Sequence, residues 1–142
     1  MLASQIIGAT EIVNFPEFNW LRVQARVDTG ARTSAMHCAR VVLEKKEGRP
    51  LLNFWLTVDA GREPVGFSTF DFQEREVKSS FGTVEKRFAI KTLVVINGRR
   101  FRGSFTLSNR DNMVYPVLIG RNFLKGRFLV DASVNKVKPS KA

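Results

Sequence analysis

Short strand-like segments separated by turn-forming residues run along most of this chain, and they constrain its fold more than any other feature. Residues 20–27 (WLRVQARV) alternate apolar and polar side chains, as a strand with one buried face does. Further segments are comparably short and rich in the β-branched and aromatic residues that favour strands: residues 39–44, 51–58, 65–72, 87–96 and 100–107. The pattern predicts at least six strands.

Turn and helix patterns narrow the fold class. Residues 96–98 (ING) predict a tight hairpin, because Asn and Gly tolerate the positive φ angles of such turns. The best helix pattern is at residues 120–126 (GRNFLKG), which predicts about one or two helical turns before residues 127–132 resume strand character. Regularly spaced short strands indicate an all-β fold, either a sandwich or a small closed barrel, and not a parallel α/β sheet.

The length indicates one domain. A chain of 142 residues buries roughly 68 to 70% of its unfolded surface, which gives a core without the need for disulfides. The hydrophobic share of 44% excludes a disordered chain. We predict a single domain over residues 1–134 and a polar, basic tail over residues 135–142.

Cysteine use and the N-terminal sequence predict a cytoplasmic, soluble protein. One Cys cannot form an internal disulfide, which fits a reducing compartment. Residues 1–15 lack the basic segment and long apolar core of a secretory leader, and no apolar run approaches the roughly 20 residues that span a bilayer. We therefore expect no membrane partner.

The charge balance points to an acidic partner. Lys and Arg outnumber Asp and Glu by 23 to 13, a net charge of +10, which favours nucleic acid, the ribosome or an acidic peptide. The basic residues are spread along the chain, without a single basic arm or a known RNA- or DNA-binding motif. This distribution favours an acidic substrate over dedicated nucleic-acid recognition. The alternative that the charge serves only solubility stays open.

Asp28 is the first candidate for chemistry. It follows the predicted strand at residues 20–27 and precedes Thr29 and Gly30. The strand would fix the carboxylate, the glycine would let the backbone turn closely, and the Thr29 hydroxyl could bond to a facing copy of the same loop. Asp-Thr-Gly also suits an ordinary turn, and the triplet alone favours that interpretation.

A second motif changes that balance. Residues 117–124 (VLIGRNFL) and residues 27–31 (VDTGA), about 90 residues apart, together resemble the two signatures of the retropepsin-like aspartic proteases. The stretches SSFGTVEKR and TLSNRDNM narrow the resemblance to the retropepsin-like endopeptidase family often labelled "ATP-dependent zinc protease". The resemblance covers roughly residues 6–134. Members of that family can accompany a glutamate ligase that adds Glu tails to a ribosomal protein.

The resemblance implies a fold, an activity and a site. The implied fold is a small closed acid-protease barrel with one short helix near the C-terminus. The implied activity is peptide hydrolysis on acidic, Glu-rich peptides or ribosomal-protein tails, with Asp28 as the catalytic carboxylate and Thr29 and Gly30 shaping its loop. Residues 79–86 would form a flap that closes over substrate. The implied substrate-binding residues are Ala31, Arg32, Gly82 and Arg121.

Peptide hydrolysis of this kind needs a second carboxylate. Two carboxyl groups about 3 Å apart share a proton, so that one activates water and the other protonates the carbonyl oxygen. The chain has a single Asp-Thr-Gly, and the simplest completion is a homodimer in which two copies of Asp28 meet on the two-fold axis. In a monomer the second acid would be Asp111 or Asp131, although each also suits an ordinary loop or strand end.

One position departs from the family pattern. Retropepsins usually carry an acidic residue two positions after the glycine, and it pairs with the Arg at the position of Arg121. This chain has Arg32 there, and two arginines cannot form that ion pair. Either the dimer is assembled differently or is absent, or Arg32 and Arg121 hold a substrate carboxylate, which suits the bidentate guanidinium.

The sequence gives no basis for a metal or a nucleotide. Zinc needs three or four His, Cys or carboxylate ligands, and the chain has one His, one Cys and no HExxH motif. Neighbours on a strand point to opposite faces, so we predict a buried apolar role for Cys38 and a surface or flanking position for His37, with no Cys-His nucleophile pair. A GxxxxGK[ST] loop for ATP is also absent. We predict no cofactor.

Two functions from different classes fit these sequence features. The leading hypothesis is an aspartic endopeptidase that uses Asp28. The alternative is a non-catalytic basic module on the same fold that binds RNA or the ribosome. Its affinity would fall steeply with salt and would not change in Asp28→Asn.

Overall fold

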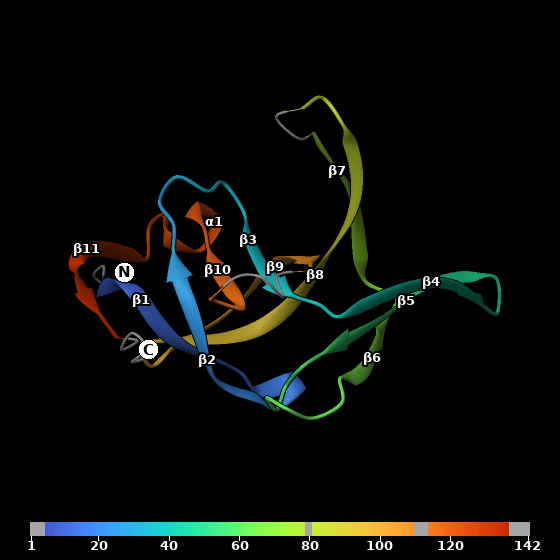
Figure 1. Ribbon diagram of the computed structural model, residues 1–142, viewed down its shortest axis with the longest axis horizontal. Helices are drawn as coiled ribbons and strands as arrows, with labels where there is room; N and C mark the ends of the chain where they lie inside the picture. Colours follow the sequence, from blue (N-terminus) through green and yellow to red (C-terminus); the bar gives the residue numbers. More distant parts are fainter. Residues whose placement is uncertain (1–4, 79–80, 110–113, 137–142) are drawn as a thin grey trace.

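Strands make up most of the computed structural model, which describes residues 5–78, 81–109 and 114–136 (Figure 1). They form an eight-stranded and a three-stranded sheet. The strands are β1 (Gln5–Phe15), β2 (Trp20–Val27), β3 (Ser34–His37), β4 (Arg40–Lys46), β5 (Arg49–Leu56), β6 (Val65–Thr69), β7 (Phe72–Lys78), β8 (Val84–Ile96), β9 (Arg99–Ser108), β10 (Val117–Ile119) and β11 (Phe128–Asn135). The helical segments are a 3₁₀ turn, η1 (Pro16–Phe18), and α1 (Arg121–Leu124).

The eight-stranded sheet closes on itself. Its order is β11-β1-β2-β10-β3-β9-β8-β7, and β1 also pairs with β8 through Val13 opposite Ile96 and Asn14 opposite Val95. This extra pairing joins β1, β2, β10, β3, β9 and β8 into a ring, with β11 and β7 attached outside it. Closure leaves the ring strands without open edges. The prediction of an all-β closed barrel with one short helix near the C-terminus is confirmed.

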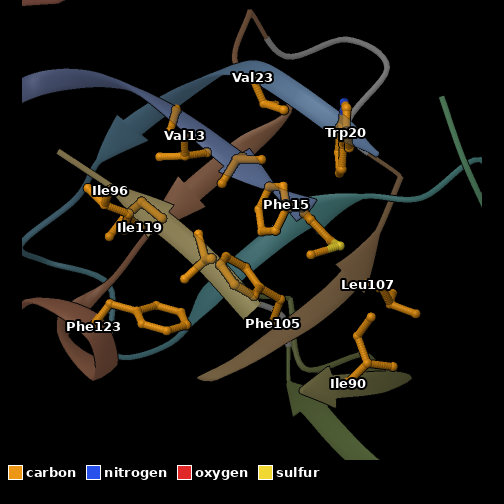
Figure 2. Close-up of a cluster of buried hydrophobic side chains, with 14 of the residues drawn as sticks. Val13, Phe15, Trp20, Val23, Ile90, Ile96, Phe105, Leu107, Ile119 and Phe123 are labelled. Atoms are coloured by element: carbon orange, nitrogen blue, oxygen red, sulfur yellow. The ribbon is translucent and has the colours of Figure 1, made fainter. Parts of the chain in front are cut away.

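Aromatic side chains fill the barrel. The rings of Phe15 and Phe105 meet edge to face with centroids 5.2 Å apart, and Phe123 of α1 packs against Phe105 at 4.8 Å. All three are fully buried, and Figure 2 shows them gathered among side chains from several strands. A helix as short as α1 is not stable alone, so its packing through Phe123 fixes its position on the barrel.

Every strand predicted from the sequence has a counterpart. Residues 20–27 coincide with β2, and the other predicted segments overlap β4, β5, β6, β8 and β9. The predicted hairpin joins β8 to β9, with Asn97 at φ 52° and Gly98 at φ 76°. The predicted tail at residues 135–142 lies almost entirely outside the described residues.

Two parts extend away from the barrel. The sheet β4-β5-β6 packs against η1 through a cluster of Phe18, Phe54 and Phe67, with Phe18 and Phe67 centroids 4.8 Å apart. The hairpin of β7 and β8 rises from the body of the molecule (Figure 1). In the part of the chain that the structure describes, no helix is long and apolar enough to cross a membrane.

Candidate active site

Asp28 stands where two parallel strands end side by side. β2 and β10 pair in parallel with Val27 opposite Ile119, so their carboxyl ends bring Asp28 next to Gly120. The Asp28 backbone N–H donates to the Ile119 carbonyl at 2.9 Å. The two sequence motifs, about 90 residues apart, therefore lie beside each other.

The Asp28 loop holds one carboxylate oxygen in place. The backbone N–H of Gly30 donates to Asp28 Oδ1 at 2.9 Å, and the N–H of Ala31 donates to the Asp28 carbonyl at 3.2 Å. Asp28 is partly buried, whereas Thr29 and Gly30 are exposed. The side chain thus makes the turn that the triplet suits and also presents an oriented carboxylate at the surface. An oriented carboxylate within reach of water can act in general acid–base chemistry.

Gly120 allows the loop and α1 to touch. A Cβ at this position would lie 2.3 Å from the Thr33 carbonyl oxygen and 2.9 Å from that of Ala31. Such distances exclude any side chain while the backbone stays in place. The next residue, Arg121, donates its backbone N–H to the Ala31 carbonyl at 2.8 Å. The loop after Asp28 therefore rests on the start of α1.

Two polar side chains lock this contact, and the sequence motifs predicted a role for neither of them. The fully buried Ser34 hydroxyl donates to Asn122 Oδ1 at 2.6 Å and accepts the Gly120 N–H at 2.8 Å. The Asn122 amide donates to the Ser104 carbonyl at 3.0 Å. Ser34 lies three residues after the first motif and Asn122 lies within the second, which is the pattern that could have identified them.

Arg32, the residue that departs from the family pattern, lies in the loop after Asp28, and Arg121 lies where α1 touches that loop. Arg32 and Arg121 are both exposed, and Arg121 Nη1 donates to the Thr29 carbonyl at 3.1 Å. Among the described residues, no acidic side chain forms an ion pair with either arginine. Their guanidinium groups can therefore bind an incoming carboxylate beside Asp28.

Gly82 lies in the β7–β8 hairpin, away from the Asp28 loop in sequence. It lies in the turn between β7 and β8, is exposed, and has φ 82°, a left-handed conformation that favours glycine. In the view of Figure 1 this hairpin and the loop after β2 both lie toward the top. Ser79 and Ser80 of the predicted flap lie outside the described residues.

Asp131 has local partners of its own. Its carboxylate accepts the Ser133 hydroxyl at 2.6 Å and the Ser133 N–H at 3.0 Å, and these bonds lower the pKa of Asp131. β1 lies between β11 and β2, which places the backbones of these two strands roughly 10 Å apart. Both facts argue against Asp131 as the second acid beside Asp28. The other candidate, Asp111, lies outside the described residues.

His37 is buried, so the prediction of a surface or flanking position is wrong. It is only 7% exposed, because β3 lies between β10 and β9 inside the ring. Cys38 is buried as predicted; its thiol donates to the Arg40 carbonyl at 3.1 Å, and burial raises the thiol pKa. In the described ranges, no three His, Cys, Asp or Glu side chains gather as a metal site would need. The absence of a cofactor stays a prediction.

Comparison with known proteins identifies the family. The family described as "RimB-like: Retropepsin-like aspartic endopeptidase RimB" matches residues 6–141. The chain belongs to the RimB-like family. The match includes the Asp28 loop, the β7–β8 hairpin and the Gly120 motif, so all three parts of the candidate site lie within the RimB-like region.

The curated relatives carry the RimB-like domain within a longer chain. A "Probable alpha-L-glutamate ligase" of Shewanella halifaxensis is 36% identical over 130 residues, which cover 90% of this chain and 28% of that protein. A protein of the same name from Desulfotalea psychrophila is 32% identical over 141 residues, covering 94% of this chain and 29% of that protein. This chain therefore spans less than a third of these relatives.

A solved structure shares the RimB-like fold. The crystal structure of Lpg0085 from Legionella pneumophila, a protein of unknown function (DUF785), matches with a TM-score of 0.70. The match covers 94% of this chain and 97% of that one at 22% sequence identity. At this identity the likeness concerns the fold alone.

Proposed function

We propose that this RimB-like domain is an aspartic endopeptidase in which Asp28 activates water for attack on a peptide carbonyl. One observation carries this assignment: the Gly30 N–H holds Asp28 Oδ1 at 2.9 Å, at the exposed end of the β2–β10 pair. The family, described as retropepsin-like aspartic endopeptidases, supports the same chemistry.

The second carboxylate comes from a second copy of the chain. Thr29 and Gly30 are exposed beside Asp28, so two loops can face each other across a two-fold axis. The two Asp28 carboxyl groups then share one proton and titrate as a unit. The ionised carboxylate takes a proton from water as the oxygen attacks the carbonyl carbon, and the other carboxyl gives its proton to the carbonyl oxygen. When the amide nitrogen receives a proton back from the pair, the C–N bond breaks.

The substrate we propose is an acidic polypeptide, such as a Glu-rich tail on a ribosomal protein. The exposed Arg32 and Arg121 beside the loop and the net charge of +10 support this choice, because guanidinium groups bind carboxylates in a bidentate manner. The names of the relatives support it as well, since a glutamate ligase makes products rich in carboxylates. The hairpin that carries Gly82 would close over the bound chain.

Cleavage of a Glu-tailed peptide and of its Gln-tailed twin, both with a chelator present, tests this assignment. We expect the wild type and the control Asp131→Asn to cut the Glu-tailed peptide faster than its Gln-tailed twin. We expect Asp28→Asn to lose at least about a hundredfold in rate with its fold retained, because it lacks the acid–base group. Arg121→Gln should reduce the preference between the peptides. Wild-type activity in Asp28→Asn would refute the role of Asp28, and cleavage seen only without chelator would show a metal-dependent enzyme.

The net charge also supports the second candidate, a non-catalytic module that binds RNA or the ribosome. This function predicts no cleavage of either peptide. It predicts instead an RNA affinity that falls steeply with salt and is the same in Asp28→Asn. Fluorescence anisotropy with a labelled RNA at several salt concentrations measures both properties.

A further inference from the structure

A groove lies toward the end of β2 opposite to Asp28, and the proposed chemistry does not use it. It has a volume of about 470 Å³, and its lining includes Trp20, Leu21, Arg22, Gln24, Val58 and Pro116. At about 3.3 Å per residue, the part of β2 that lines it is roughly 13 to 26 Å from Asp28. Figure 1 shows β2 running from this region toward the Asp28 loop.

A β-bulge shapes the wall of the groove. β1 and β2 pair with Val13 opposite Val23 and Phe15 opposite Trp20. Between these pairs β1 contributes one residue, Asn14, whereas β2 contributes two residues, Leu21 and Arg22. One residue more on one strand defines a bulge, and bulges redirect side chains.

The bulge exposes two consecutive side chains on β2. Leu21 is 52% exposed and Arg22 is also exposed, whereas the flanking Trp20 and Val23 are 5% and 4% exposed. A regular strand would turn one of two consecutive residues inward. Here an apolar and a cationic side chain instead stand together at the groove.

Arg22 holds a backbone conformation that favours glycine. Its φ is 56°, and Asn14 Oδ1 accepts its backbone N–H at 2.7 Å. Non-glycine residues rarely adopt this conformation, and where they do the site is often functional. The chain has an arginine at a position where glycine would be less strained, and its side chain is exposed at the groove.

A second groove continues the first one. It shares Leu21 and Val58 with the first, has a volume of about 420 Å³, and extends to the exposed Val65. Two acidic residues line it: Asp59, which pairs with Arg62 at 3.1 Å, and Glu63. In the first groove the described lining contains Arg22 and no carboxylate. The first groove therefore offers the cation Arg22, and the apolar contact surface of Leu21 and Val58 continues into the second groove.

We propose that these grooves form a docking site for an extended polypeptide segment with a carboxylate next to a large apolar side chain. The Arg22 guanidinium binds the carboxylate, and Leu21 and Val58 pack against the apolar side chain. Because the second groove continues the first past Leu21, the site has room for several residues of the segment. Binding here is independent of peptide hydrolysis at Asp28.

Binding of a fluorescein-labelled peptide, Gly-Ser-Leu-Glu-Leu-Glu-Gly-Ser, to the full chain tests the site by anisotropy. We expect binding that weakens about tenfold or more when Gln replaces Glu, when Ser replaces Leu, or in Arg22→Gln. The variant Arg100→Gln, which removes an exposed arginine outside the grooves, should bind like the wild type. Asp28→Asn should also bind normally, so failure of this site and failure of the peptidase assignment are distinguishable.

The variant Arg22→Gly separates binding from folding. Glycine tolerates φ 56°, so we expect an unfolding midpoint within about 5 °C of the wild type together with loss of peptide binding. In NMR titrations the peptide should shift the backbone amides of Leu21 and Val58. Unchanged binding in both Arg22 variants, shifts confined to the Asp28 loop, or no binding at millimolar peptide would each overturn the proposal.

Discussion

Around Asp28, the side chain that holds the loop is Ser34, a residue with no chemical step of its own in the proposed reaction. Its hydroxyl accepts the backbone N–H of Gly120 at the end of β10 and donates to the side-chain oxygen of Asn122 in α1. Gly120 follows β10, the strand that pairs with β2 beside Asp28, so the position of Asp28 depends on a hydroxyl six residues away in sequence.

Ser34→Ala should therefore weaken both fold and catalysis. It leaves the buried Gly120 N–H without an acceptor and Asn122 Oδ1 without its donor, which costs about 1 to 3 kcal/mol in the free energy of unfolding. We expect kcat for peptide cleavage to fall with little change in KM, because the loop loses its position and the arginines stay. Urea titration and steady-state kinetics measure these effects. The exposed Ser68 hydroxyl, which donates to Asn53 at 2.6 Å, gives a control in Ser68→Ala, and equal behaviour of both variants would contradict the role of Ser34.

At this scale the sequence predicts the residues of local motifs and misses those that act through tertiary contact. Asp28 and Gly30 form their hydrogen bond within one turn, so the three-residue motif is enough to predict it. Ser34 and Asn122 are 88 positions apart and meet only because β3 and β10 pair. The prediction for His37 is wrong for a similar reason, since its burial depends on strands on both sides of β3.

Among the elements, the sequence predicts those with intact alternation well and misses those that pair irregularly. β2 from Val23 onward and the β8–β9 hairpin follow the alternating pattern and the Asn-Gly turn. β1 does not, because it pairs with β2 on one side and β11 on the other and buries Glu11, whose carboxylate accepts the Gly8 N–H at 2.9 Å. Because Gly8 and the buried Glu11 interrupt its apolar residues, β1 has no regular apolar pattern from which the sequence could predict it.

Glu17 joins η1 to the barrel, and we expect this link to depend on pH. Its carboxylate accepts the Arg102 guanidinium, the Leu93 N–H at 3.2 Å and the Thr92 hydroxyl at 3.3 Å. These bonds, led by Arg102, lower the pKa of Glu17 below its ordinary value of 4.5. The stabilisation is therefore present above about pH 4.5 and is lost as pH falls through the lowered pKa.

Glu17→Gln should accordingly be less stable than the wild type at pH 7, and the difference should shrink as pH falls below 4.5. Urea unfolding at a series of pH values measures this difference. Glu44→Gln, on the exposed face of β4, is the matched control and should show no such trend. A difference that is constant with pH would show that Glu17 acts through packing alone.

For the whole molecule, the proposed reaction requires two chains, because the described residues supply one oriented carboxylate at the β2–β10 end. The alternating pattern and the motifs predict the barrel of one chain, since its contacts are encoded in buried faces. They leave the dimer open, because Arg32 replaces the acidic residue that would have indicated the family's pairing.

Mixing experiments test this requirement. If subunits exchange at random, an equal amount of Asp28→Asn added to the wild type should reduce activity to about half, because about half of the wild-type chains then pair with an inactive copy. A ninefold excess should leave about a tenth. Asp131→Asn, as the control, should leave activity undiminished. Activity that is indifferent to added Asp28→Asn would show that each chain acts alone.

The pairing of β2 with β10 also bears on when the proposed activity could arise during synthesis. The two strands that position Asp28 are separated by about 90 residues, so they are among the last partners to meet as the chain emerges. A nascent chain that already displays Asp28 still lacks Gly120, Ile119 and the α1 contact that orient the loop. The proposed peptidase activity would therefore be absent until translation of the domain is nearly complete.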